Sequence, residues 1–187
     1  SEALFSAGDL QTLVNRGFIS PENAALELER QGWDINSARQ GIALRFVLPG
    51  PADIVRFAVR EAFSPDVVAR FGQDEDFPSD AVPLAERVGV QADDLRLFWR
   101  AHWELPSANQ GYEMLHRDII DLDTLNLLLR TQDVMPFWRQ PLVDIAYTPF
   151  TRVDIRRFYR QGILNRADVI RAYKDIGFDP AKAEIQA

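Results

Sequence analysis

The sequence contains no cysteine, and this absence removes several kinds of chemistry. It excludes disulfide bonds, thiolate metal sites and cysteine nucleophiles. No run approaches the roughly 18 apolar residues that a membrane-spanning helix needs, so we expect no membrane contact. The first residues, Ser1-Glu2-Ala3, are neither a basic signal peptide nor an amphipathic presequence, and with no initiator Met we expect processing or a fragment of a longer polypeptide.

Histidine is scarce, since only His102 and His116 occur, and no His-Glu-x-x-His pattern accompanies them. Both are predicted to be structural. The carboxylates of Asp118, Asp121 and Asp123 lack the glycine and the downstream Glu of a calcium loop, and Asp121 is predicted to cap the next helix. A Gly-rich phosphate loop and a Ser nucleophile elbow are also missing. We therefore predict no catalytic, metal or cofactor-binding residues and a protein that is not an enzyme.

Apolar residues make up 47% and charged residues 26% of the 187 residues, as in ordinary globular proteins. No alternating strand pattern or Asn-Gly hairpin occurs, whereas apolar residues recur at helical spacing throughout. The predicted fold class is all-α: an array of helical hairpins, or helix-turn-helix repeats, with short loops.

The strongest pattern is an internal repeat, because a shift of 145 positions superposes Asp9–Ile35 on Asp154–Pro180 without a gap. Gly17 and Gly162 coincide and are predicted to close the first helix with positive φ. Two apolar residues follow each glycine and are predicted to turn inward. These pairs are Phe18-Ile19 and Ile163-Leu164, and they precede the predicted N-caps Ser20 and Asn165.

A third copy is visible at an offset of 101, with Asp118 in place of the glycine. Asp tolerates the left-handed region less well than Gly but better than most residues. A fourth, degenerate copy is predicted around Ala62-Phe63, which puts the turns at 17, 62, 118 and 162. The alternative is that unrelated hairpins share a common type of turn sequence. We favour true repetition, which implies stacked units with a shared core.

The run Leu48-Pro49-Gly50-Pro51 is the best candidate for a linker. It separates a predicted N-terminal part, 1–48, from a predicted helical repeat domain, 49–187, with one continuous domain over 1–187 as the alternative. A third helix is predicted before this linker, from Asn36 as its N-cap to about Phe46.

Charge is unevenly distributed along a chain whose net charge is −7. Seven basic and two acidic residues lie between Thr151 and Lys174, a local +5 that leaves −12 for the remainder. Arg152, Arg156 and Arg160 recur every four residues along one helix, with Arg157 on a neighbouring face. This row predicts contact with an acidic partner, including another molecule of the same chain; the alternative is a helix-turn-helix that contacts nucleic acid through the 151–174 hairpin.

Two further groups are interface candidates. Trp138 and Arg139 are of the types enriched at binding hot spots, with packing between hairpins as the alternative. The run Asp74-Glu75-Asp76 lies in a predicted acidic loop, either solvated or in contact with a basic partner.

Several segments carry a resemblance to known proteins. They are Phe57–Phe63, Asp74–Pro78, Phe98–Ser107, Gln110–Met114, Met135–Arg139 and Thr151–Asp154. Across residues 50–185 the chain resembles large, poorly characterised virion structural proteins of tailed bacteriophages. The resemblance implies a particle component near the portal, neck or tail, with other virion proteins or copies of itself as partners. It implies location in the virion, and in the host cytoplasm during assembly, and brings no catalytic residue.

Overall fold

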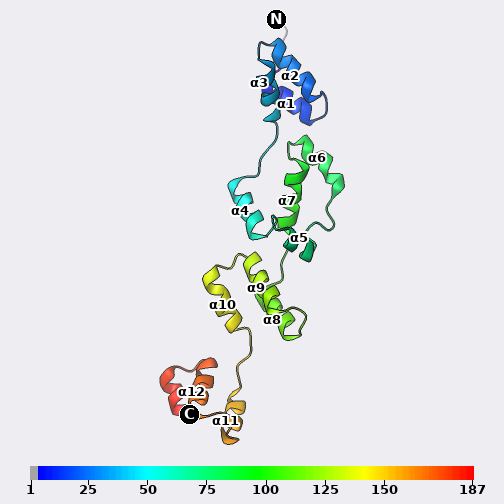
Figure 1. Cartoon of the computed structure of the whole chain (residues 1–187). Coiled ribbons are helices and arrows are strands. Elements are labelled where there is room, and N and C mark those ends of the chain that lie inside the picture. The colour runs from blue at the N-terminus through cyan, green and yellow to red at the C-terminus, as the bar shows by residue number, and fades with distance from the viewer. Residues whose placement is uncertain (1–3) are drawn as a thin grey trace. The chain divides into compact units, whose positions relative to one another are not determined.

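A computed structural model describes residues 4–187, in which thirteen α-helices and one 3-10 helix occur and no strand is present (Figure 1). The predicted all-α fold is therefore confirmed. Ser1-Glu2-Ala3 lies outside the described residues. In chain order the helices are α1 (Ala7–Asn15), α2 (Pro21–Arg30), α3 (Ile35–Ala43), α4 (Pro51–Val59), α5 (Pro65–Phe71), η1 (Ser79–Ala81), α6 (Val82–Arg87), α7 (Ala92–His102), α8 (Ala108–His116), α9 (Leu122–Thr131), α10 (Pro136–Asp144), α11 (Arg152–Arg160), α12 (Arg166–Asp175) and α13 (Pro180–Gln186).

The helix boundaries follow a helical repeat with a period of 44 residues. First helices begin at Ala7, Pro51, Ala108 and Arg152, so the steps are 44, 57 and 44 positions. Shifting α1, α2 and α3 by 101 positions reproduces the bounds of α8, α9 and α10. We call α1–α3 repeat 1, α4–α7 repeat 2, α8–α10 repeat 3 and α11–α13 repeat 4. The longer middle step reflects the extra helix of repeat 2, α7, because η1 and α6 together span 79–87, the bounds of α3 shifted by 44 positions.

Each hairpin turns on one residue with positive φ, as the glycines predicted. The φ angles are 76° at Gly17, 57° at Glu61, 55° at Asp118 and 72° at Gly162. The next residue then donates its N–H to a carbonyl five positions back, which satisfies an orphan acceptor of the first helix. These bonds, all 2.9 Å, are Phe18 to Leu13, Ala62 to Phe57, Ile119 to Met114 and Ile163 to Phe158. The turn residue of repeat 2 is thus Glu61, one position before the predicted centre.

Side-chain caps start most of the repeated helices. Ser20 accepts from the N–H of Asn23 at 3.1 Å, and Asn165 accepts from the N–H of Asp168 at 3.0 Å, both as predicted. The start of α3 differs from the prediction. Asp34, not Asn36, is its N-cap, because the Asp34 carboxylate accepts the N–H of Ser37 at 2.9 Å.

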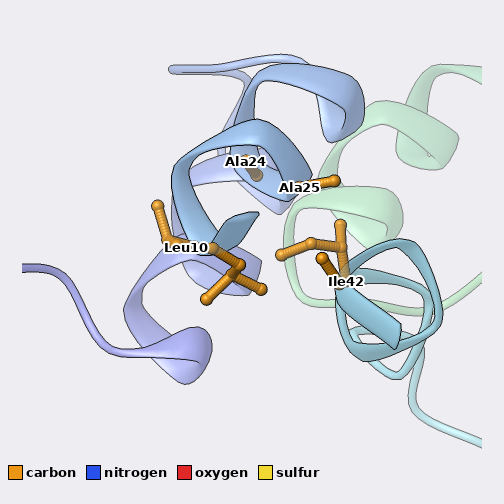
Figure 2. Packing of buried hydrophobic residues seen from close by; sticks show 6 residues of the cluster. Leu10, Ala24, Ala25 and Ile42 are labelled. Atoms are coloured by element: carbon orange, nitrogen blue, oxygen red, sulfur yellow. The ribbon is translucent and has the colours of Figure 1, made fainter. Parts of the chain in front are cut away.

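The core of repeat 1 is built from small and branched residues that bring three helices close together. Leu10 of α1, Ala24 and Ala25 of α2 and Ile42 of α3 converge in Figure 2, and each is almost fully buried. The remaining buried members are Leu28 and Ala38. Repeat 4 buries four of the six corresponding positions, namely Ile155, Val169, Tyr173 and Ala183, and partly buries Ile170 and Ala187.

In the core of repeat 3, the large and small residues exchange places between the first and the second helix. Gly111 stands where repeat 1 has Leu10, and Leu125 stands where repeat 1 has Ala24. A Cβ atom on Gly111 would lie 2.9 Å from Cδ1 of Leu125 and 2.8 Å from Cδ2 of Leu128. The large side chain is on the first helix in repeat 1 and on the second helix in repeat 3, so the total side-chain volume at this site is similar in the two repeats.

The chain forms two compact units. One comprises the described residues up to Leu105 together with Arg130–Asp133, and the other comprises Pro106–Leu129 and Val134–Ala187. Repeats 1 and 2 supply the first unit, and repeats 3 and 4 supply most of the second. The boundary at 48/49 stays a prediction.

Candidate interaction surfaces

Helix α11 presents the basic row to solvent. Its inner face places Ile155 in the core, which fixes the opposite face outward. All four arginines of the row are exposed: Arg152, Arg156, Arg157 and Arg160.

The four arginines differ in their partners. The Arg152 guanidinium lies 4.8 Å from the ring centre of Phe178, and Arg157 donates to Asp154 at 2.9 Å. Arg156 and Arg160 form no ion pair, hydrogen bond or ring contact with any residue in the described part of the chain. Two cations one helical turn apart are therefore available to an external partner.

The other basic residues of this hairpin are mostly engaged. Arg166 of α12 lies 3.4 Å from Glu184, and Arg171 donates to Asp175 at 2.9 Å. Asp168 adds a negative charge to the first turn of α12. The second helix of the hairpin is consequently less cationic at its surface than α11.

One carboxylate of the acidic run, that of Asp74, is paired with a side chain of its own unit. Asp74 accepts two hydrogen bonds of 2.7 Å from Arg100 of α7, and Arg100 also donates to the carbonyl of Ala62 at 3.0 Å. Hydrogen bonding from Arg100 lowers the pKa of Asp74. Glu75 and Asp76 remain exposed at the surface of the loop.

Tryptophans of α7 hold the same loop. The indole of Trp99 donates to the carbonyl of Glu75 at 2.9 Å, and the indole of Trp103 donates to the carbonyl of Gln73 at 3.0 Å. Both indoles are half-buried, and their hydrogen bonds stabilise packing within the unit. The two tryptophans therefore anchor the acidic loop in a fixed conformation.

Trp138 and Arg139 both lie on α10, but they differ in exposure and in hydrogen bonding. Trp138 is 54% exposed and contributes to an open apolar groove of about 550 Å³. The groove is lined by Val134, Met135, Trp138, Pro141, Leu142 and Ile145. Arg139 is half-buried, and its Nε donates to the carbonyl of Val134 at 2.8 Å, so this guanidinium stabilises the turn before α10.

Exposed apolar residues at the hairpin turns form a further candidate surface. The residue after the left-handed position is a large apolar side chain in three repeats, and it is 70% exposed at Phe18, 64% at Ile119 and 64% at Ile163. The prediction that both apolar residues of each pair turn inward is wrong for this first residue, whereas the second residue of each pair is half-buried. A single short turn cannot direct two adjacent side chains into the same core.

The histidines and the aspartate cluster make local contacts. His102 stacks with Trp99 and His116 with Tyr147. Asp121 accepts the N–H of Thr124 at 2.8 Å and so caps α9, as predicted. Residues 4–187 contain no group of three His, Cys, Asp or Glu side chains placed to hold a metal ion. Among the helices described, none combines the length and apolar character that crossing a membrane requires.

Comparison with known proteins gave no match to a protein family, a curated protein or a solved structure.

Proposed function

We propose that this chain is a non-enzymatic assembly module of a tailed-phage particle that works through protein–protein contacts. The observation that carries the proposal is the apolar side chain exposed at the same turn position of three repeats, at Phe18, Ile119 and Ile163. A position that three of the four repeats fill with a large, accessible apolar side chain is suited to docking. The resemblance of residues 50–185 to virion structural proteins supports the particle setting.

Burial of these side chains would favour association. Covering one exposed Phe or Ile yields about 1.5–3 kcal/mol from the hydrophobic effect, before the entropy of association is subtracted. The apolar groove on α10, with Trp138 at its rim, offers another surface of the same chemical kind. Several such contacts, repeated along a helical array, would give a multivalent interface.

The assembly proposal is tested with a triple variant, Phe18→Ser, Ile119→Ser and Ile163→Ser. We expect the wild-type chain to form concentration-dependent oligomers in sedimentation velocity and the variant to sediment as a monomer with unchanged helical circular dichroism. Ile185→Ser is the control, because Ile185 is 81% exposed but lies on α13, away from the hairpin turns.

The particle setting has its own test, which is mass spectrometry of purified virions of the phage that encodes this sequence. We expect the chain among the particle proteins. Absence of the chain from intact particles would overturn the particle setting. Self-association that is unchanged in the triple variant would overturn assembly through the turn residues.

Nucleic-acid contact through the 151–174 hairpin is the second candidate, favoured by the unpaired Arg156 and Arg160. It predicts binding to a DNA duplex that weakens steeply with salt, because cationic side chains release counterions from phosphates. Fluorescence anisotropy with an R156A/R160A variant measures this directly. The corresponding positions of repeat 1 are Gln11 and Asn15, so the basic row is a property of repeat 4 alone.

A further inference from the structure

The repeat register identifies the residues of the other repeats that correspond to Arg156 and Arg160. In repeat 1 the corresponding residues are Gln11 and Asn15, both half-buried. Gln11 donates to the carbonyl of Gly41 at 2.7 Å, and Asn15 donates to the carbonyl of Arg45 at 3.2 Å. The chain at the end of α3 therefore lies against these two positions and accepts hydrogen bonds from them.

Repeat 3 partly buries the first of these positions and leaves the second exposed. They are occupied by Tyr112, which is half-buried and whose pKa is raised by burial, and by His116. The His116 ring lies 5.3 Å from the ring of Tyr147, in the segment that follows α10. In both repeats, then, the segment after the third helix contacts this face of the first helix.

Repeat 4 has a cationic surface at these positions. Arg156 and Arg160 are exposed without a partner among residues 4–187, and Val153, on the same side of α11, is 72% exposed. Cations stand at the two positions whose neutral side chains donate hydrogen bonds in repeat 1. The face therefore combines an exposed apolar side chain with two cationic donors, which suits an anionic acceptor.

The most suitable acceptor on this chain is the loop between Gly72 and Pro83. Glu75, Asp76 and Asp80 are exposed there and form no salt bridge with the described residues. The charge balance points the same way, since residues 151–174 carry +5 and the remainder of the chain −12. Because Arg100 and Trp99 fix this loop, its carboxylates lose little conformational freedom when a partner binds.

We propose that the exposed face of α11, formed by Val153, Arg156 and Arg160, docks onto the 75–80 acidic loop of a second molecule of this chain. The inference rests on the proposed assembly function and names its partner and contact. Since two different surfaces meet, the contact is heterologous and propagates into a ring or an open filament.

Charge reversal tests the contact. R156E/R160E and D76R/D80R each place like charges at the interface, so we expect each variant alone to self-associate at least about tenfold more weakly than wild type. An equimolar mixture of the two variants restores opposite charges, and we expect association to return. Sedimentation equilibrium at low and high salt measures both effects, and circular dichroism confirms that each variant is folded.

R16E/R30E is the matched control, because it makes the same change in net charge at two exposed arginines of repeat 1. We expect it to associate like wild type. Self-association that persists unchanged in both reversed variants, or a mixture that fails to recover, would overturn this contact while leaving the assembly proposal standing. A wild-type chain that remains monomeric but is present in virions would also overturn it. DNA binding lost in R156E/R160E, without self-association of the wild type, would instead assign the face to nucleic acid.

Discussion

The guanidinium of Arg100 donates two hydrogen bonds of 2.7 Å to the carboxylate of Asp74, across 26 positions of sequence. The same guanidinium binds the carbonyl of Ala62, in the hairpin turn of repeat 2. One side chain of α7 thus joins the acidic loop to the turn. Repeat 2 differs here from repeats 1, 3 and 4, because the extra helix α7 follows its η1–α6 segment.

Removing this contact is expected to destabilise repeat 2. Asp74→Asn loses the charge-assisted pair and should lower the free energy of unfolding by about 1 kcal/mol, since the carboxylate is partly exposed. Arg100→Ala also leaves the Ala62 carbonyl without its donor, and we expect about 2 kcal/mol. Urea denaturation measures both values.

The exposed ion pair of Arg39 with Glu22 is the matched control for this prediction, because both of its side chains are more than half exposed. Glu22→Gln should have a much smaller effect. An effect of Asp74→Asn no larger than that of Glu22→Gln would contradict the structural role of Asp74.

Stability should also depend on pH through Asp74. The hydrogen bonds from Arg100 hold the pKa of Asp74 below its ordinary value of 3.8. A carboxyl with a lowered folded-state pKa contributes stability above its unfolded pKa and loses that contribution as the pH falls through the folded value. Between pH 5 and 3 we therefore expect the urea midpoint to fall less in Asp74→Asn than in wild type. Parallel declines in the two proteins would show that other carboxyls account for the pH dependence.

The exchanged packing of repeat 3 predicts a specific coupling. Gly111→Leu alone overpacks the core and should destabilise by about 1–3 kcal/mol or more, whereas Leu125→Ala alone leaves a cavity and should cost about 2–5 kcal/mol. The double variant reproduces the Leu10/Ala24 pair of repeat 1, so we expect it to be at least about 1 kcal/mol more stable than the sum of the single effects. A double-mutant cycle by urea denaturation measures this coupling, and strict additivity would count against the exchange.

The hairpin turns allow backbone strain to be measured without side-chain clashes. Gly162 has a φ of 72°, and no heavy atom lies within 4 Å of a Cβ built on it, so Gly162→Ala should destabilise by about 1 kcal/mol through the backbone alone. Asp118→Gly relieves the same conformation and should stabilise by up to about 1 kcal/mol.

Gly8→Ala serves as the reference for the glycine series. Gly8 lies within α1, and the nearest atom to an added Cβ is 3.9 Å away, so we expect stabilisation by about 0.5–1 kcal/mol. Equal responses of Gly162→Ala and Gly8→Ala in thermal and urea unfolding would refute the strain at the turn.

The positions of helices and turns could be predicted from the sequence because local interactions set them. Gly17 and Gly162 close their helices through backbone freedom, and Ser20 and Asn165 cap the next helices through bonds to residues three positions away. Even Asp118 takes the left-handed conformation that alignment with the glycines indicated. Each of these preferences acts within a few residues and is repeated along the chain, so one match supports the others.

The candidate surfaces depended on contacts that the local sequence does not specify. In the run Asp74-Glu75-Asp76, only the fold shows that Asp74 is already paired with Arg100. Arg139 is of the type found at interfaces, yet its Nε donates to a backbone carbonyl of its own repeat. The sequence marked where apolar and charged residues lie, but it did not show which of them the fold satisfies internally.

By itself, then, the sequence determined an all-α chain with a recurring hairpin, since helix periodicity, left-handed turns and N-caps are all short-range effects. Tertiary structure decided which apolar residue of each turn faces solvent, how Gly111 and Leu125 share one core volume, and which arginines of α11 lack a partner. These outcomes depend on atoms brought together from distant positions, where packing density and the satisfaction of hydrogen bonds settle the arrangement.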